Sequence, residues 1–172
     1  GCGAGLLSEP LARMGGLVSA VDAAPKNIAA ARAHMELSGL NIDYHAGELA
    51  EQNLGHFDLI TAMEVIEHVA DPAEFVALLA RHLAPGGLLL LSTPNRTAAS
   101  RLFLVEAAER LGQVPRGTHD WNQFLTPEEL EDILGKAGLQ ITDIQGIAFS
   151  PFKGLHLSGD RSLNYILAAK FK

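Results

Sequence analysis

The sequence predicts an α/β fold in which helices cover a mostly parallel sheet that ends in an antiparallel hairpin. Three observations support this fold. A glycine-rich loop precedes a helix and a strand at the start of the chain, and strands and helices then alternate. No helical pattern separates the last two strands, so they should pair antiparallel. Because a parallel sheet has a buried centre and no strand precedes Gly1, we expect the central strand to lie upstream of the given sequence.

The loop that opens the chain is Gly1-Cys2-Gly3-Ala4-Gly5, whose alternate glycines permit positive φ and close approach of the backbone to a ligand. It leads into an apolar helical segment, residues 6–14, and then into a strand, residues 17–21, which Asp22 closes. A carboxylate at that place accepts hydrogen bonds from ribose hydroxyls in nucleoside-binding α/β units. We therefore expect Gly1, Gly3, Gly5 and Asp22 to bind a nucleoside cofactor, with Cys2 packed beneath the loop.

The spacing of the loop is G-x-G-x-G and differs from the G-x-G-x-x-G of dinucleotide-binding proteins. With the acid downstream, it resembles motif I of the class I S-adenosylmethionine (SAM) methyltransferases. SAM has no pyrophosphate, so the loop only has to pass close to the methionine part and the ribose. The alternative is a tight strand-to-helix turn that binds no ligand.

The remaining elements follow from periodicity and from proline and glycine positions. Helices are expected from Pro25 to Ser38, from Pro72 to the Leu83–Gly87 stretch, and from Pro127 to about Ala137. The last two begin at the capping boxes that start at Asp71 and Thr126. Strands are expected at residues 42–45, 57–62, 88–92, 139–146 and 162–169, and the apolar run at 57–62 predicts a buried one.

The amino-acid composition limits the classes of protein to which the chain can belong. The 172 residues, 48% of them hydrophobic, suit a single domain spanning residues 1–172. No apolar run approaches the roughly 18 residues of a membrane span, and no signal peptide is recognisable. The single cysteine excludes an internal disulfide and fits a reducing compartment. The net charge of −7 argues against a nucleic-acid partner.

Several polar residues follow predicted strands, where ligands of open α/β sheets bind. Glu48 follows the second strand and has two open roles, a contact to the adenine amino group or an acid in the first turn of a helix. Met63 directly follows the third strand, where its flexible side chain is expected to pack on the adenine or the thioether. Residues 93–96 leave the next strand, and Asn95 among them is a catalytic candidate.

The stretch from Glu64 to His68 predicts a metal site if it forms one helical turn. Glu64, Glu67 and His68 would then lie at i, i+3 and i+4, on one face. Two carboxylates and an imidazole would favour Mg²⁺ over Zn²⁺. The alternative is a stretch without metal, in which His68 only caps or orients its neighbours.

Five stretches together resemble the ubiquinone-biosynthesis O-methyltransferases. They are residues 1–9, 63–69, 92–96, 115–121 and 163–165, of which Arg116–Asp120 and Asn164-Tyr165 are the most specific. The resemblance spans essentially the whole chain and implies SAM as the cofactor and a prenylated phenol or catechol as the substrate. Some members are described as Mg²⁺-dependent, which implies Glu64, Glu67 and His68 as ligands. Pro94 departs from the usual leucine and leaves the role of Asn95 open.

Residues 96–124 form an insertion between a strand and a helix, with an apolar stripe that includes Leu102 and Phe103. Three roles are open for it, namely a membrane-interface helix, a lid over the active site, or a core-facing helix. His119 is a candidate general base or substrate contact, and Asp120 beside it allows a purely structural role. Trp121 is a candidate wall for the substrate ring.

These observations predict a SAM-dependent O-methyltransferase that deprotonates a phenol with the help of Mg²⁺ or of His119. The alternatives are a metal-free methyltransferase for another small molecule, a NAD-binding oxidoreductase, which the loop spacing opposes, and a silent module that binds SAM or membrane. A cytoplasmic location is expected, with peripheral contact to the bacterial inner membrane or, in a eukaryote, the matrix side of mitochondria. Assembly with other ubiquinone-biosynthesis enzymes is a further possibility.

Overall fold

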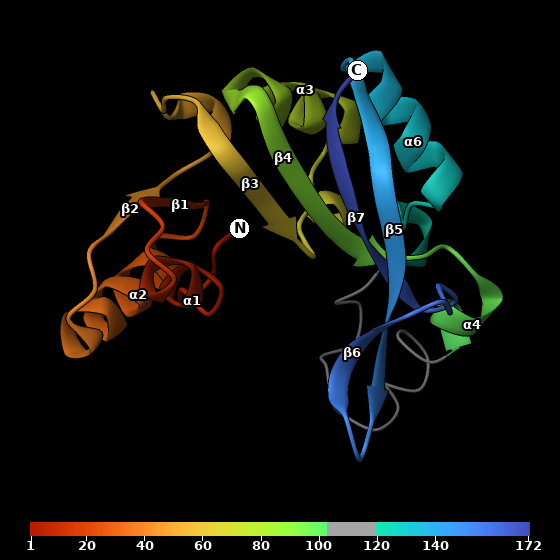
Figure 1. Cartoon of the computed structure of the whole chain (residues 1–172), viewed down its shortest axis with the longest axis horizontal. Helices are drawn as coiled ribbons and strands as arrows, with labels where there is room; N and C mark the ends of the chain where they lie inside the picture. Colours follow the sequence, from red (N-terminus) through yellow and green to blue (C-terminus); the bar gives the residue numbers. More distant parts are fainter. Residues whose placement is uncertain (103–119) are drawn as a thin grey trace. The chain divides into compact units, whose positions relative to one another are not determined.

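The computed structural model describes residues 1–102 and 120–172. These residues form two compact units, Gly1–Gly55 and His56–Lys172, and each unit has its own sheet (Figure 1). No helix in the described residues is long and apolar enough to cross a membrane. The expected central strand is not among the described residues, and its existence stays a prediction.

The first unit is a two-stranded parallel sheet with two helices. Its elements are α1 (Ser8–Arg13), β1 (Val18–Asp22), α2 (Pro25–Ser38), β2 (Ile42–Ala46) and the 3-10 turn η1 (Leu49–Glu51). Proline at the first position starts α2, and Gly39 ends it in the left-handed conformation with φ 65°. Ala31 and Ile28 of α2 are buried against Ala20, Ile42 and Tyr44 of the strands, which form the core of this unit.

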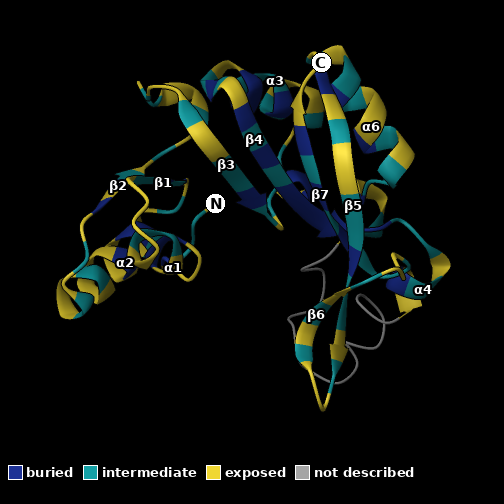
Figure 2. Ribbon diagram, in the orientation of Figure 1, coloured by how far each residue is buried: buried dark blue, intermediate teal, exposed yellow. Residues whose placement is uncertain are grey.

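The second unit contains the larger sheet. Its elements are β3 (Phe57–Met63), η2 (Ile66–His68), α3 (Pro72–His82), β4 (Leu83–Pro94), α4 (Ala98–Ser100), η4 (Trp121–Gln123), α6 (Pro127–Lys136), β5 (Leu139–Ser150), β6 (Gly154–Ser158) and β7 (Asn164–Phe171). Within the described residues the strand order is β3-β4-β7-β5-β6. Figure 2 shows that β4 and β7, in the middle of the sheet, carry most of its buried residues, while α3 and α6 pack against each other and against the sheet.

Strand directions place three strand ends at one edge of this sheet. β3 and β4 are parallel, β7 runs antiparallel to β4, and β5 runs antiparallel to β7. Because two reversals restore the direction, β5 runs parallel to β4. The carboxyl ends of β3, β4 and β5 therefore lie at the same edge, and the β5–β6 hairpin projects beyond it (Figure 1).

The predicted elements are confirmed with three corrections. β3 is mostly not buried in the part of the chain that the structure describes, where it forms an edge of its sheet and where Asp58 and Leu59 are exposed. β4 begins at Leu83 and not at Leu88, because the chain from residue 84 to residue 87 forms an irregularity within the strand, with Gly86 at φ 80°. The short strand β6 was not predicted at all, although the antiparallel pairing of β5 with β7 was.

Candidate active site

In the first unit, Asp22 is tied directly to the glycine loop. Its Oδ2 accepts a hydrogen bond from the Gly3 amide (2.8 Å), and its Oδ1 accepts from the Ala24 amide (2.9 Å) and from Asn27 Nδ2 (3.0 Å). The loop runs along the end of β1, where the Cys2 amide donates to the Val21 carbonyl (2.9 Å). The predicted partners, loop and acid, are therefore brought together, and the acid holds the loop in place.

These hydrogen bonds control the charge of Asp22. Burial alone would raise the pKa of its carboxyl group, but the hydrogen bonds from Ala24, Gly3 and Asn27 outweigh it and hold the pKa below the ordinary value of 3.8. The carboxyl group is thus ionised at neutral pH. A carboxylate offers about four acceptor positions, so its three protein donors leave little room for a ribose unless one of them is displaced.

The glycines of the loop have different surroundings. Gly3, at φ 56°, has open space where a Cβ would stand, so a ligand can approach its backbone. Gly5, at φ 88°, is buried, and a Cβ there would overlap the hydroxyl oxygen of Tyr44 on β2. Gly1 is exposed. The missing side chain of Gly5 makes room for Tyr44, and the binding of a cofactor by the three glycines stays a prediction. Cys2 packs against the core of this unit, as expected.

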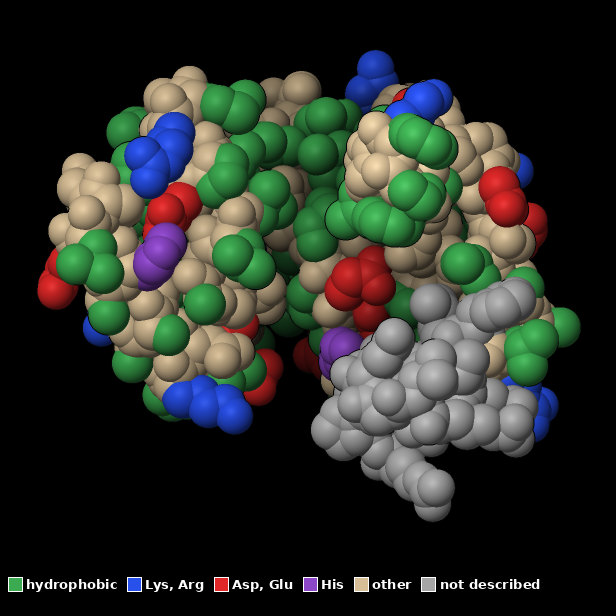
Figure 3. Space-filling model, turned by 90° about the horizontal axis from the view of Figure 1, so that it is seen from below, with side chains coloured by type: hydrophobic (Ala, Val, Ile, Leu, Met, Phe, Trp, Pro, Cys, Tyr) green, Lys and Arg blue, Asp and Glu red, His purple; other side chains and the backbone are tan. Residues whose placement is uncertain are grey.

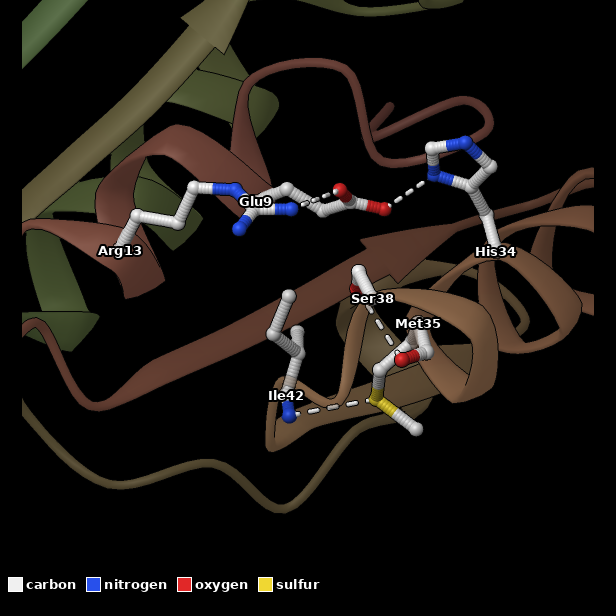
Figure 4. A network of polar contacts seen from close by, with 6 residues as sticks. All are labelled: Glu9, Arg13, His34, Met35, Ser38 and Ile42. Atoms are coloured by element: carbon white, nitrogen blue, oxygen red, sulfur yellow. Dashed lines mark hydrogen bonds and ion pairs between the residues drawn. The ribbon is translucent and has the colours of Figure 1, made fainter.

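A buried acid on α1 links the two helices of the first unit. The carboxylate of Glu9 lies between Arg13, at 3.6 Å, and His34 of α2, which contacts its other oxygen (Figure 4). His34 lies on the surface of α2, and its contact to Glu9 was not predicted. Helical spacing alone could have paired Glu9 with Arg13 at i+4, whereas the contact to His34 depends on how α1 and α2 pack.

Glu48 precedes η1 and is exposed. Its side chain does not cap the turn, and its carbonyl oxygen accepts from the Glu51 amide (3.1 Å) and from Gln52 Nε2 (3.3 Å). Its place at the N-cap of η1 agrees with the alternative of an acid at a helix N-terminus, although its side chain makes no capping hydrogen bond. Its proposed contact to adenine stays a prediction.

In the second unit, Glu64 adopts a left-handed backbone at the end of β3. It is the one non-glycine residue with positive φ (53°) in the described chain. Its amide donates to the Ser92 carbonyl (3.0 Å), and its Oε1 accepts from Ser92 Oγ (2.7 Å). Such a conformation is costly outside glycine and is enriched at functional sites. It directs the chain away from β3 just after Met63, which is partly exposed.

Glu67 is a buried acid held by the neighbouring strand. Thr93 Oγ1, itself fully buried on β4, donates to Glu67 Oε2 (3.0 Å). Burial is the main cause that raises the pKa of Glu67 from 4.5 to about 7, and the charge of Glu64 adds to it. Thr93 was named only within residues 93–96, and Ser92 was not predicted as a site residue, although two hydroxyls directly after the run Leu88–Leu91 were a usable signal.

The predicted metal geometry is wrong. The helical turn covers only Ile66–His68, and the left-handed Glu64 lies outside it. His68 Nε2 is 3.9 Å from Glu67 Oε1, and Glu64 and Glu67 are held by different residues of β4. Among residues 1–102 and 120–172, no three His, Cys, Asp or Glu side chains are placed to hold a metal ion. The three predicted ligands therefore do not form a magnesium site in this arrangement.

Asn95 acts as a structural anchor after β4. It is buried, its Nδ2 donates to the Arg161 carbonyl (2.8 Å), and its amide donates to the Leu163 carbonyl (2.8 Å). These contacts fix the segment that leads into β7, so the side-chain amide expected to be catalytic is already engaged. Asn164-Tyr165, a specific part of the predicted resemblance, starts that strand, and Tyr165 Oη donates to the Leu125 carbonyl (3.0 Å).

Only the ends of the predicted insertion are described. Trp121 Nε1 donates to the Thr97 carbonyl (2.9 Å), and the Arg101 guanidinium lies over its ring, 5.6 Å from the centroid. Trp121 is thus fixed against the start of α4. His119 and most of the apolar stripe lie outside the described residues, so their predicted roles stay predictions.

Comparison with known proteins identifies the family. A family model described as "Methyltransferase domain" matches residues 1–144. The ubiquinone biosynthesis O-methyltransferase of Methylocella silvestris is 47% identical over 98% of this chain and 68% of its own length. The protein of the same name from Cereibacter sphaeroides (strain ATCC 17025 / ATH 2.4.3) is 46% identical over 98% of this chain and 70% of its own length.

A solved structure agrees on the fold. Magnesium protoporphyrin IX methyltransferase from Synechocystis PCC 6803 with bound SAH covers 100% of this chain and 72% of its own, with a TM-score of 0.74 at 23% identity. At that identity the match shows the fold alone, whereas the closer relatives show the family. The chain therefore belongs to the SAM-dependent methyltransferases and, among them, to the ubiquinone biosynthesis O-methyltransferase family.

Proposed function

We propose that this chain transfers the methyl group of SAM to a phenolic hydroxyl of a prenylated catechol that is a precursor of ubiquinone. The observation that carries this proposal is the 47% identity, over 98% of the chain, to a relative named for O-methylation in ubiquinone biosynthesis. The SAM-binding loop with its ionised acid and the polar residues at the ends of β3 and β4 supply the chemistry such a reaction needs.

In the proposed cofactor site, Gly3 gives the backbone access to the methionine part of SAM, and Asp22 receives the ribose. Ribose hydroxyls would compete with the Gly3 amide for Asp22 Oδ2, so the loop should shift when SAM binds. Met63 and Glu48 are proposed to contact the adenine or the thioether. Gly5 supports the loop from beneath, through its packing on Tyr44.

Methyl transfer needs the phenolic oxygen in line with the sulfonium methyl, and holding both in that geometry supplies much of the acceleration. The hydroxyl proton must also leave. We propose Glu64, exposed at the end of β3, and His119 as the groups that receive it. Glu67 is proposed to position the turn through its bond to Thr93.

No step of this mechanism runs through a metal ion. Binding of Mg²⁺ by Glu64, Glu67 and His68 would require these side chains to move from the arrangement described, in which they do not converge. We also propose that the whole of residues 1–172 is part of one methyltransferase domain. Residues 96–124 are proposed to touch lipid or to cover the substrate. The protein is proposed to work peripherally at a membrane, alone or assembled with other enzymes of the pathway.

The test is to incubate the purified chain with SAM and a prenylated catechol, with and without a chelator of divalent metal ions, and to measure the methylated product. We expect the methyl ether to form in both. Glu64→Gln should lower kcat by about 10² or more, the size of a lost general base, while SAM affinity stays within about twofold. Glu131→Gln, on the exposed side of α6, is the matched control and should leave both unchanged. Equal kcat for Glu64→Gln and wild type would remove Glu64 from the mechanism.

A further inference from the structure

The β5–β6 hairpin carries an apolar face that nothing in the described chain covers. In its register Ile147 pairs with Leu157, and Phe149 pairs with Leu155. Because side chains alternate along a strand and directly paired residues share a face, these four lie on the same face of the hairpin. The opposite face carries small or polar residues, among them the Ala148–His156 and Gly146–Ser158 pairs.

The exposure of this face is unusual. Phe149 is 72% exposed, Leu155 76%, Leu157 62%, and Phe152 in the turn 99%. Four of the twelve large hydrophobic side chains exposed in the described residues thus fall within nine residues of sequence. Figure 3 looks onto the tip of the hairpin and shows hydrophobic side chains gathered around it. A contiguous patch of this kind marks an interaction site, whereas singly exposed residues do not.

The charge of the hairpin differs from that of the chain. The chain carries a net charge of −7, yet no Asp or Glu occurs between Asp143 and Asp160. The formally charged residue in that segment is Lys153, beside Phe152 in the turn, and His156 lies on the opposite face. An apolar tip with a cation and no acid is complementary to a surface of anionic lipid headgroups over hydrocarbon.

We propose that the β5–β6 hairpin inserts its tip into an anionic lipid bilayer. The four exposed side chains are few for a dimer, which needs about 800 Å² from each partner, whereas a narrow projecting hairpin can enter a headgroup layer. β5 ends at the same edge of the sheet as β3 and β4, so the hairpin presents the edge that carries Glu64 to the membrane. This last step rests on the proposed function, since a prenylated substrate resides in the bilayer.

The test is flotation of the full chain with vesicles of phosphatidylcholine alone and with added phosphatidylglycerol, without SAM or substrate. We expect binding that requires the anionic lipid, and a loss of at least tenfold for Phe152→Asp. Lys153→Glu should lower binding to anionic vesicles several-fold. The matched control is Leu37→Asp on α2, 88% exposed in the first unit, which should bind like wild type. Thermal unfolding of each variant checks that it is folded.

Vesicle binding by Phe152→Asp equal to that of wild type, or no binding by wild type to either vesicle, would overturn the proposal. A dimer in light scattering that Phe152→Asp dissociates would assign the tip to a second copy and also overturn it. Activity on a short-chain soluble catechol separates failure of the membrane proposal from failure of the proposed function. It should be the same in Phe152→Asp and wild type, while activity on a vesicle-embedded substrate falls.

Discussion

Substitution of Gly5 by alanine tests how the glycine loop is built. Alanine at φ 88° costs about 1–2 kcal/mol in backbone strain. Its Cβ would also overlap the Tyr44 hydroxyl oxygen, and overpacking of this kind costs about 1–3 kcal/mol more. We therefore expect Gly5→Ala to lower the free energy of unfolding by about 2–5 kcal/mol, measured by urea denaturation. SAM affinity should fall with it, because the loop rests on this contact.

Two further variants separate strain from overlap. Gly3→Ala has the same kind of backbone strain, at φ 56°, but meets nothing within 4 Å, so its cost should stay at about 1–2 kcal/mol. Tyr44→Phe removes the overlapping oxygen and leaves the ring carbon Cζ at 3.3 Å from the new Cβ. It should recover part of the loss in Gly5→Ala and none of the loss in Gly3→Ala. Equal costs for the two alanine variants, or no coupling between residues 5 and 44, would refute this account of the loop.

Two other substitutions test the hydrogen bonds that fix the elements. The lowered pKa of Asp22 means that its carboxylate stabilises the fold above the ordinary pKa of 3.8, and that this stability is lost as the pH falls through the folded-state pKa. Asp22→Asn should therefore flatten the acid limb of urea stability measured from pH 6 to pH 3, and curves parallel to wild type would contradict this. Thr126→Ala removes the Oγ1 that accepts a hydrogen bond from the Glu129 amide. The other hydrogen bond of this capping box, from the Thr126 amide to Glu129 Oε2 (2.9 Å), remains possible in the variant. Thr126→Ala should cost about 1 kcal/mol in the same assay, while Thr126→Ser should cost little; equal losses in both variants would exclude the cap as the cause.

The sequence was most informative where local chemistry decides structure. Proline at the first helical position and glycine after the last one located α2, and the capping box at Thr126 located the start of α6, because both act within one turn. The antiparallel pairing of β5 with β7 followed from the absence of a helix between them. The family resemblance rested on short motifs along the whole chain and was confirmed by the relatives.

What the sequence could not predict depends on contacts between distant segments. A left-handed Glu64 is fixed by Ser92, 28 residues away, so the helical spacing that suggested one metal-binding face did not apply. Asn95 was expected to be catalytic because it follows a strand, but its side-chain amide donates a hydrogen bond to the carbonyl of Arg161, 66 residues away. Nothing in the sequence indicated that Gly5 packs on Tyr44, 39 residues away. β6 was missed, although residues 155–158 alternate apolar and polar side chains, because this alternation covers only four residues.

The central claim is that this chain moves a methyl group from SAM to a phenolic oxygen. The most direct measurement is mass spectrometry after incubation of the full chain with SAM carrying an isotope-labelled methyl group and a prenylated catechol. The account predicts a labelled methyl ether and an equal amount of S-adenosylhomocysteine, both strongly reduced by Glu64→Gln. No labelled ether under conditions in which the chain binds SAM, or label found on a carbon or nitrogen atom, would contradict it.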